Sequence, residues 1–165
     1  MKFGGTSVGS ASAMLRVKQI VEQSTEPAIV VVSAMGGITD RLINTAKMAS
    51  SGDKGYISEL QFIIDKHHST INELMGDSAL AKEILTKVDA MIDELSNIYK
   101  GICLIKDLSE RTRDTIVSYG ERLSSTIIAA VIDGAELKDS RSIIRTTHYY
   151  DKHIVDFEQT NQRIR

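Results

Sequence analysis

The stretch AIVVVSAMGGITD, residues 28–40, places a run of apolar residues directly before a pair of glycines and a set of polar side chains. A continuous β-branched run is typical of a strand that is covered on both faces, as in a parallel sheet. Gly36 and Gly37 predict a tight turn after the strand, and helically spaced apolar residues follow. We expect Thr39 or Asp40 to cap this helix. The stretch therefore predicts a strand, a turn and a helix in succession.

The first seven residues, MKFGGTS, show the same order of features. A short apolar start ends at Phe3, Gly4 and Gly5 predict a turn, and helically spaced apolar residues follow from Ser10. Pro27 then ends any helix before the second strand. Two successive strand-turn-helix units predict the α/β class.

The middle of the chain, about residues 56–100, changes to a helical pattern. Apolar residues recur there at steps of three and four on both sides of a short break at residues 76–78. This pattern predicts an antiparallel helical hairpin. His67 and His68 lie close to Asp65, but no third ligand occurs at a helical spacing on that face. We therefore expect seam or surface histidines and no metal site.

The last part of the chain returns to mixed structure. Residues 113–132 are rich in Ile, Val and Leu, which predicts a long buried helix that is broken or bent near Gly120 and ended by Gly134. We expect a short strand around residues 135–137 and one more helix from Glu158. This last pattern stops without a C-cap, so we expect the architecture to be incomplete.

Composition limits the classes of function. The 165 residues suit one domain, and 20 Lys and Arg against 22 Asp and Glu give a net charge of -2, so we expect no nucleic-acid partner. No apolar run approaches the roughly 18 residues of a membrane span, so we expect no membrane partner. Cys103 is the only cysteine and no signal-peptide pattern is visible, which together favour a cytoplasmic location.

Both glycine turns are expected at the carboxyl ends of strands, where helix N-termini favour bound anions. Lys2 lies two residues before the first turn and supplies a cation. The spacing matches neither common phosphate-binding glycine motif, and a glycine pair alone is also typical of a plain tight connection. Two such turns with hydroxyl residues, together with the upstream lysine, favour a phosphate-handling site.

Glu121, in the stretch YGERLS, is the third candidate. Its carboxylate either pairs with Arg122 on the surface or faces inward toward a cationic group. In the second case it suits a substrate ammonium, and Ser33 and Thr39 offer neutral hydrogen bonds nearby. A small substrate that carries both an amine and a carboxylate fits this set.

Three motifs carry a family resemblance, in this order: KFGGTS (2–7), VVSAMGGITD (31–40) and VSYGERLSS (117–125). With a helical hairpin between the second and the third, the chain resembles the amino-terminal half of aspartate kinases, within the amino acid kinase family. The stretch DSRSIIRTT, residues 139–147, also resembles a D-x-R-x-x-x-x-T pattern of this family. The long hairpin is similar to that of the lysine-sensitive enzymes and of the bifunctional aspartokinase/homoserine dehydrogenases.

The resemblance implies a three-layer αβα amino acid kinase fold of the α/β class, with an incomplete, mostly parallel sheet and an inserted antiparallel helical hairpin. Residues 1–165 would form the amino-terminal, aspartate-binding part of the kinase domain, with the insert at about residues 56–100. The implied activity is transfer of the γ-phosphoryl group of ATP to the β-carboxylate of L-aspartate, in the biosynthesis of lysine, threonine and methionine.

The resemblance also assigns roles to matching positions. Lys2 would be catalytic, because its ammonium would neutralise the transferring phosphate. The positions against the nucleotide phosphates would be Lys2, Gly4, Gly5, Thr6 and Ser7. The positions that contact L-aspartate would be Ser33, Thr39 and Glu121, and the last would hold the α-ammonium. The implied partners are L-aspartate and ATP with Mg²⁺, with no metal ligand expected among these residues. We also expect a homo-oligomer, because an incomplete sheet exposes an unpaired edge.

The sequence departs from the family pattern in two places. The strand before the first glycine turn is only about three residues long, where the family has several more. The family also places a further glycine-rich motif, an acidic catalytic residue and a substrate-binding arginine in its carboxyl half, and these 165 residues contain none of them. We therefore expect this chain to be inactive by itself.

Three alternatives to an aspartate kinase stay open from the sequence. A non-catalytic module would bind phosphate or acidic amino acids without turnover. An interaction protein would work through the helical hairpin, so that Leu74→Asp would abolish its activity and a change at Lys2 would not. Another amino acid kinase, acting on glutamate or a carbamate, is the third. A substrate with no free ammonium would leave a buried Glu121 unpaired, which is costly.

Overall fold

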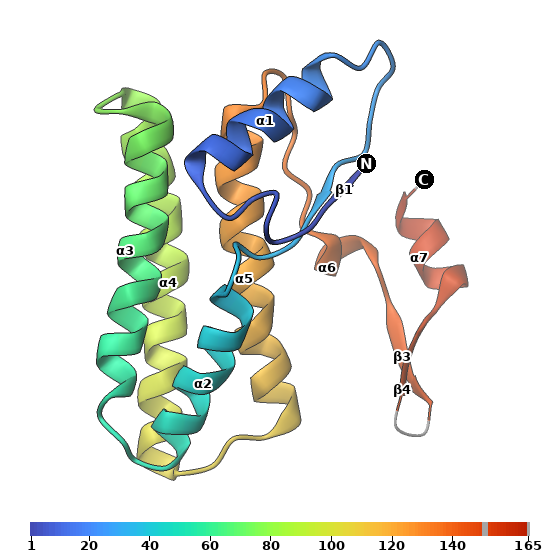
Figure 1. Cartoon of the computed structure of the whole chain (residues 1–165). Coiled ribbons are helices and arrows are strands. Elements are labelled where there is room, and N and C mark those ends of the chain that lie inside the picture. Colours follow the sequence, from blue (N-terminus) through green and yellow to red (C-terminus); the bar gives the residue numbers. More distant parts are fainter. Residues whose placement is uncertain (150–151, 165) are drawn as a thin grey trace. The chain divides into compact units, whose positions relative to one another are not determined.

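The computed structural model describes residues 1–149 and 152–164, and the chain divides into two compact units, Met1–Ala135 and Glu136–Arg165 (Figure 1). In the first unit the elements follow in the order β1 (Lys2–Phe3), α1 (Ala11–Glu22), β2 (Val31–Val32), α2 (Ile38–Ser50), α3 (Tyr56–Met75), α4 (Ala79–Ile105) and α5 (Glu110–Val131). The second unit contains α6 (Ser140–Ile143), β3 (Thr146–Tyr149), β4 (Lys152–Val155) and α7 (Phe157–Ile164).

A parallel pair of short strands, β1 and β2, begins the first unit. Lys2 is opposite Val31 and Phe3 is opposite Val32, and the Ser33 N–H extends the ladder by donating to the Phe3 carbonyl at 3.0 Å. The expectation of a strand from residue 28 that is covered on both faces is wrong. The ladder reaches only as far as β1 offers partners, and the side chains of Ile29 and Val31 are 84% and 53% exposed.

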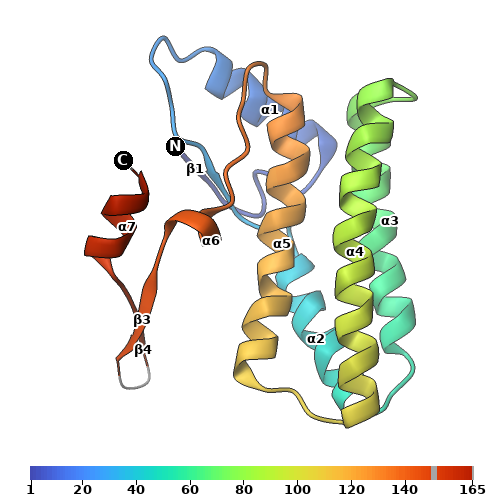
Figure 2. The same ribbon diagram turned by 180° about the vertical axis from the view of Figure 1, so that it is seen from behind.

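The expected antiparallel helical hairpin is confirmed by α3 and α4, which lie side by side with opposite directions (Figures 1 and 2). Ser78 begins α4, because its hydroxyl accepts the Ala81 N–H. Buried apolar residues at helical spacing join the two helices to α2 and α5 in one core. Those from the hairpin include Ile63, Ile71, Ile84, Val88, Leu95 and Tyr99. The second helix runs five residues beyond the expected end at residue 100, to Ile105.

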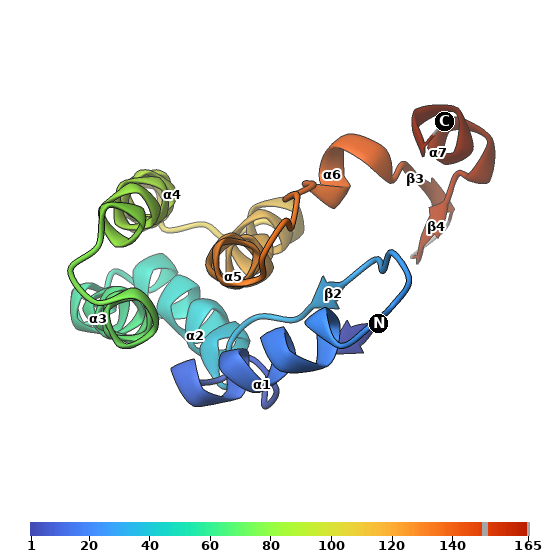
Figure 3. The ribbon, with the colours of Figure 1, turned by 90° about the horizontal axis from the view of Figure 1, so that it is seen from above.

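Seen end-on, β2 lies between α5 and α1, with the hairpin to one side (Figure 3). The mixed helix-strand class with a parallel sheet is therefore as expected. Helix α5 runs without interruption through Gly120, so of the break or bend expected there, the break is wrong. No helix in the described part of the chain combines the length and the apolar character that a membrane crossing requires.

In the second unit, β3 and β4 pair antiparallel, with Thr146 opposite Val155. Helix α7 confirms the helix expected from Glu158. The strand expected at residues 135–137 is wrong, because these exposed residues have no ladder partner. Asp139, in the D-x-R pattern, caps α6 by accepting the Arg141 N–H at 3.0 Å, and it also pairs with the guanidinium of that arginine.

Candidate functional site

The two glycine turns touch each other through their backbones. A Cβ atom at Gly5 would lie 3.0 Å from the Ala34 carbonyl oxygen and 3.5 Å from the Gly36 Cα. A Cβ atom at Gly36 would in turn lie 3.4 Å from the Gly5 carbonyl oxygen. A side chain on Gly5 would therefore push the turns apart, and the glycine permits the close approach. The structure brings together the first two sequence motifs, as expected.

The second turn starts helix α2 at least two residues earlier than expected. Gly37 is the N-cap, with a φ of 80° that glycine adopts readily, and no side chain caps the helix. The expectation that Thr39 or Asp40 provides the cap is therefore wrong. Both residues lie in the first helical turn, where the Asp40 carboxylate complements the positive end of the helix dipole. Thr39 is partly buried.

Helix α5 brings the third motif to the second turn. A Cβ atom at Gly120 would lie only 2.7 Å from the Ala34 Cβ, so this glycine lets the helix approach the turn closely. One residue further, the Glu121 carboxylate accepts the Ala34 N–H through its Oε1 atom at 3.3 Å. The side chain of Glu121 is partly buried at this position. The inward orientation, one of the two that the sequence allowed, is the one observed.

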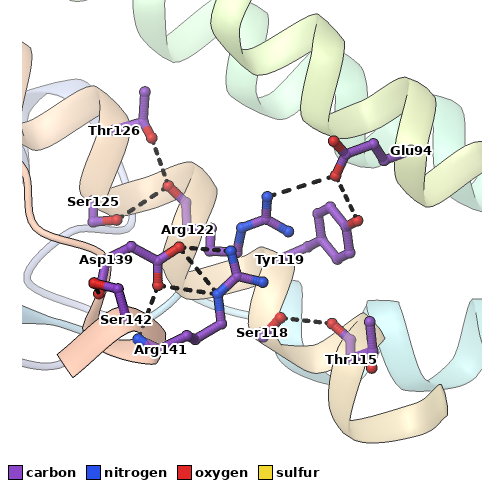
Figure 4. Close-up of polar contacts among 10 residues, drawn as sticks. All are labelled: Glu94, Thr115, Ser118, Tyr119, Arg122, Ser125, Thr126, Asp139, Arg141 and Ser142. Carbon is purple, nitrogen blue, oxygen red and sulfur yellow. Dashed lines mark hydrogen bonds and ion pairs between the residues drawn. The ribbon is translucent and has the colours of Figure 1, made fainter. Parts of the chain in front are cut away.

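The alternative surface pairing of Glu121 with Arg122 is wrong, because Arg122 has other partners. Its guanidinium lies over the Tyr119 ring, 4.3 Å from the ring centroid, and 3.6 Å from Glu94 Oε2 on α4 (Figure 4). The Tyr119 hydroxyl donates to the same Glu94 oxygen at 2.9 Å (Figure 4). Burial raises the pKa of the Tyr119 hydroxyl, so it stays protonated as a donor. These contacts fasten α5 to α4 and leave Glu121 to the glycine turn.

Ser124 is a residue of this site that the sequence analysis missed. Its hydroxyl donates to the Ser33 carbonyl oxygen at 2.7 Å, and its side chain is fully buried. The helical spacing could have indicated Ser124, because it lies three residues after Glu121 and residues at this spacing share a helix face. Ser33, partly buried, is thereby tied to α5 through its backbone.

Lys2 and the first turn present groups that suit an anion. The Lys2 side chain is exposed, and its ammonium forms no hydrogen bond or ion pair within the described chain. Thr6 is exposed, and no atom lies within 4 Å of the position where Gly4 would carry a Cβ. Ser7 closes the turn by donating its N–H to the Gly4 carbonyl at 2.9 Å. A cation with no partner in the described chain, two residues before an open glycine turn, suits a phosphate group.

The two adjacent histidines are seam and surface residues, as expected. His67 is fully buried in α3, with Nδ1 2.6 Å from the Ile63 carbonyl oxygen, and burial lowers its pKa. His68 points outward and pairs with Asp89 on α4 at 2.7 Å. In residues 1–149 and 152–164, no three His, Cys, Asp or Glu side chains converge as a metal site would require. The neutral His67 side chain belongs to the core.

Comparison with known proteins gives consistent matches. The amino acid kinase family model matches residues 1–163. The chain is 38% identical over 142 residues to aspartokinase 1, chloroplastic, of Arabidopsis thaliana. This match covers 84% of the chain and 24% of the relative. It is 29% identical over 169 residues to the plant's bifunctional aspartokinase/homoserine dehydrogenase 2, chloroplastic, covering 99% of the chain and 18% of the relative. The chain thus spans a quarter or less of these relatives.

Solved structures share the fold. Aspartokinase III of E. coli, in a complex with aspartate and ADP, matches with a TM-score of 0.82 and 25% identity over 98% of this chain and 35% of that chain. The aspartate kinase of Clostridium acetobutylicum matches with a TM-score of 0.71 and 23% identity over 99% of this chain and 34% of that chain. The expected α/β fold class is confirmed by these matches.

Proposed function

The chain belongs to the amino acid kinase family, and we propose that it forms the L-aspartate-binding part of an aspartate kinase. In the proposed reaction a β-carboxylate oxygen of L-aspartate bonds to the γ-phosphorus of ATP, while the bond from that phosphorus to ADP breaks. Support comes from relatives named aspartokinases and from a similar structure described as a complex with aspartate and ADP. The product of this reaction is an acyl phosphate. The proposed role of the enzyme is in amino-acid biosynthesis, specifically that of lysine, threonine and methionine.

The position of Glu121 carries this proposal. One carboxylate oxygen accepts the Ala34 N–H, and within the described chain the other oxygen has no hydrogen-bond or ion-pair partner. A partly buried carboxylate with a free oxygen is suited to a charge-assisted hydrogen bond from an ammonium group. Ser33 directly precedes Ala34, which Glu121 contacts, and Thr39 lies in the first turn of α2; both would supply neutral hydroxyls for the rest of the substrate. An α-amino acid satisfies all three.

The first turn is proposed to face the nucleotide. Lys2 would neutralise charge on the transferring phosphoryl group, and the backbone of residues 4–7 would lie against the phosphates. ATP supplies the phosphoryl group, with Mg²⁺ bound to its phosphate oxygens. No carboxylate cluster in the described chain is suited to hold that metal. The chain's own part is to orient the acceptor amino acid and to present one cation.

Residues 1–165 would form the aspartate-binding part of one kinase domain, with residues 56–100 as an insert, and would be inactive alone. We further propose a homo-oligomer in the cytoplasm, although the plant relatives are named as chloroplastic proteins.

A coupled assay of ADP release tests the proposal in the polypeptide that the complete reading frame encodes. With L-aspartate as acceptor, Lys2→Ala is expected to lower kcat, and Glu121→Gln is expected to raise the KM for L-aspartate. Glu94→Gln is the matched control, because Glu94 contacts α5 through Arg122 and not through the glycine turn. Unchanged kinetics in both variants, or binding of L-aspartate without any turnover, contradict the kinase assignment.

A further inference from the structure

Helix α5 holds the peptide bond between Ser33 and Ala34 by both of its polar atoms. The carbonyl oxygen, on Ser33, accepts the Ser124 hydroxyl at 2.7 Å. The N–H group, on Ala34, donates to the Glu121 carboxylate at 3.3 Å. The C=O and N–H of a trans peptide point in opposite directions, so two such contacts fix the rotation of the peptide plane. The orientation of this peptide therefore depends on two side chains of one helix.

Ser124 differs from the hydroxyl residues next to it. Ser125 and Thr126 both donate to the Arg122 carbonyl within α5, at 3.1 Å and 2.8 Å (Figure 4). The Ser124 oxygen lies 3.2 Å from a carbonyl of its own helix, that of Glu121, but the Ser33 oxygen is closer at 2.7 Å. A hydroxyl has one proton to donate, so the shorter contact takes it. Ser124 is thus the member of this group that reaches another segment.

We propose that Ser124 is a positioning residue of the acceptor site, which holds the Ser33–Ala34 peptide so that Ser33 and Glu121 meet the same substrate. Without the hydroxyl, the Ser33 carbonyl loses its side-chain donor from α5, and an unsatisfied carbonyl favours rotation of the peptide toward another donor. That rotation withdraws the Ala34 N–H from Glu121. The substrate class, an α-amino acid with a second carboxylate, rests on the proposed function.

Kinetics of Ser124→Ala and Ser124→Cys test the proposal in the polypeptide of the complete reading frame. Ser125→Ala is the matched control, since it removes the same group from the next residue. Loss of one buried hydrogen bond is expected to raise the KM for L-aspartate about five- to tenfold in Ser124→Ala. Ser124→Cys, of similar size with a weak donor, should give a smaller rise, and the KM for ATP should change less than about twofold in all three. Equal effects in Ser124→Ala and Ser125→Ala overturn the proposal.

A second readout does not depend on activity. In the ¹⁵N-labelled 165-residue chain, the Ala34 amide resonance is expected to move in Ser124→Ala, because its hydrogen bond to Glu121 lengthens, and to stay in place in Ser125→Ala. An Ala34 resonance unchanged in both Ser124 variants overturns the proposal. If Ser124→Ala does not fold, Ser124→Cys carries the same comparison. A shifted Ala34 resonance in Ser124→Ala, together with no aspartate-dependent kinase activity in the polypeptide of the complete reading frame, supports the peptide contact and refutes the proposed function, so the two fail separately.

Discussion

Two glycines in helices, Gly120 and Gly101, should respond in opposite directions to the same substitution by alanine. In a helix interior, Gly→Ala stabilises by roughly 0.5–1 kcal/mol, because alanine loses less backbone entropy on folding. Outside its own stretch of α4, no atom lies within 4 Å of the position of a Cβ at Gly101, so Gly101→Ala should gain this full amount. The Gly101→Ala variant therefore measures, without any steric cost, the stabilisation that alanine brings to a helix.

Gly120→Ala adds a steric cost to the same gain. The new Cβ would lie 2.7 Å from the Ala34 Cβ and 3.4 Å from Leu42 Cδ1. The Ala34 Cβ is attached directly to the backbone, so the turn itself must move. Inserting a methyl group into a packed contact costs about 1–3 kcal/mol. After the helix gain of about 1 kcal/mol, the net result is a loss of up to about 2 kcal/mol.

Urea unfolding followed by circular dichroism measures both variants against the wild type. The difference between the two free energies of unfolding equals the steric term, so it should be about 1–3 kcal/mol. If the two alanines stabilise the chain equally, α5 does not approach the second glycine turn as described. The position of Glu121 beside Ala34 would then lose its structural basis.

Two further predictions concern pH. Burial lowers the pKa of His67 in the folded chain, so below about pH 6.5 the unfolded chain binds more protons than the folded chain. The free energy of unfolding should therefore fall as the pH drops from about 6.5 through the lowered pKa, by at most about 1.4 kcal/mol per pH unit. Urea unfolding at several pH values should show a flatter dependence in His67→Gln than in the wild type, and an equal dependence in the two proteins would contradict the assignment to His67. The hydrogen bond from Lys18 lowers the pKa of Glu22, so this carboxylate should stabilise above about pH 4.5 and lose that effect as pH falls through its lowered pKa. Glu22→Gln and added salt should both weaken this acid dependence in thermal melts, and no change in either would contradict the pairing.

The sequence was informative wherever structure depends on local pattern. Helical spacing predicted the hairpin, and the glycine pairs predicted the two turns. That these turns meet also followed from the sequence, because neighbouring parallel strands end at the same edge of a sheet. Glu121 could be named as a candidate from its place after Gly120, although its inward orientation was left open against pairing with Arg122.

The features that the sequence did not predict depend on contacts between distant segments of the chain. A strand forms only where another strand pairs with it, so the apolar run from residue 28 overpredicted β2. The N-cap of α2 was predicted at Thr39 or Asp40 from their polar side chains. The helix begins earlier, because Gly37 adopts a left-handed conformation and is itself the N-cap. The sequence does not distinguish Ser124 from the neighbouring hydroxyl residues of the same helix. Only the structure shows that its hydroxyl donates to the Ser33 carbonyl of a distant segment.

The recognition of the acceptor's ammonium by Glu121 is tested most directly by comparing L-aspartate with succinate, which lacks that group. Binding of both is measured by calorimetry in the polypeptide of the complete reading frame, for the wild type and Glu121→Gln. A charge-assisted hydrogen bond of about 1.5–3 kcal/mol predicts that the wild type prefers L-aspartate by about 10- to 150-fold. We expect Glu121→Gln to lose most of this preference while succinate binding changes little. An equal preference in both proteins would contradict the proposed role of Glu121.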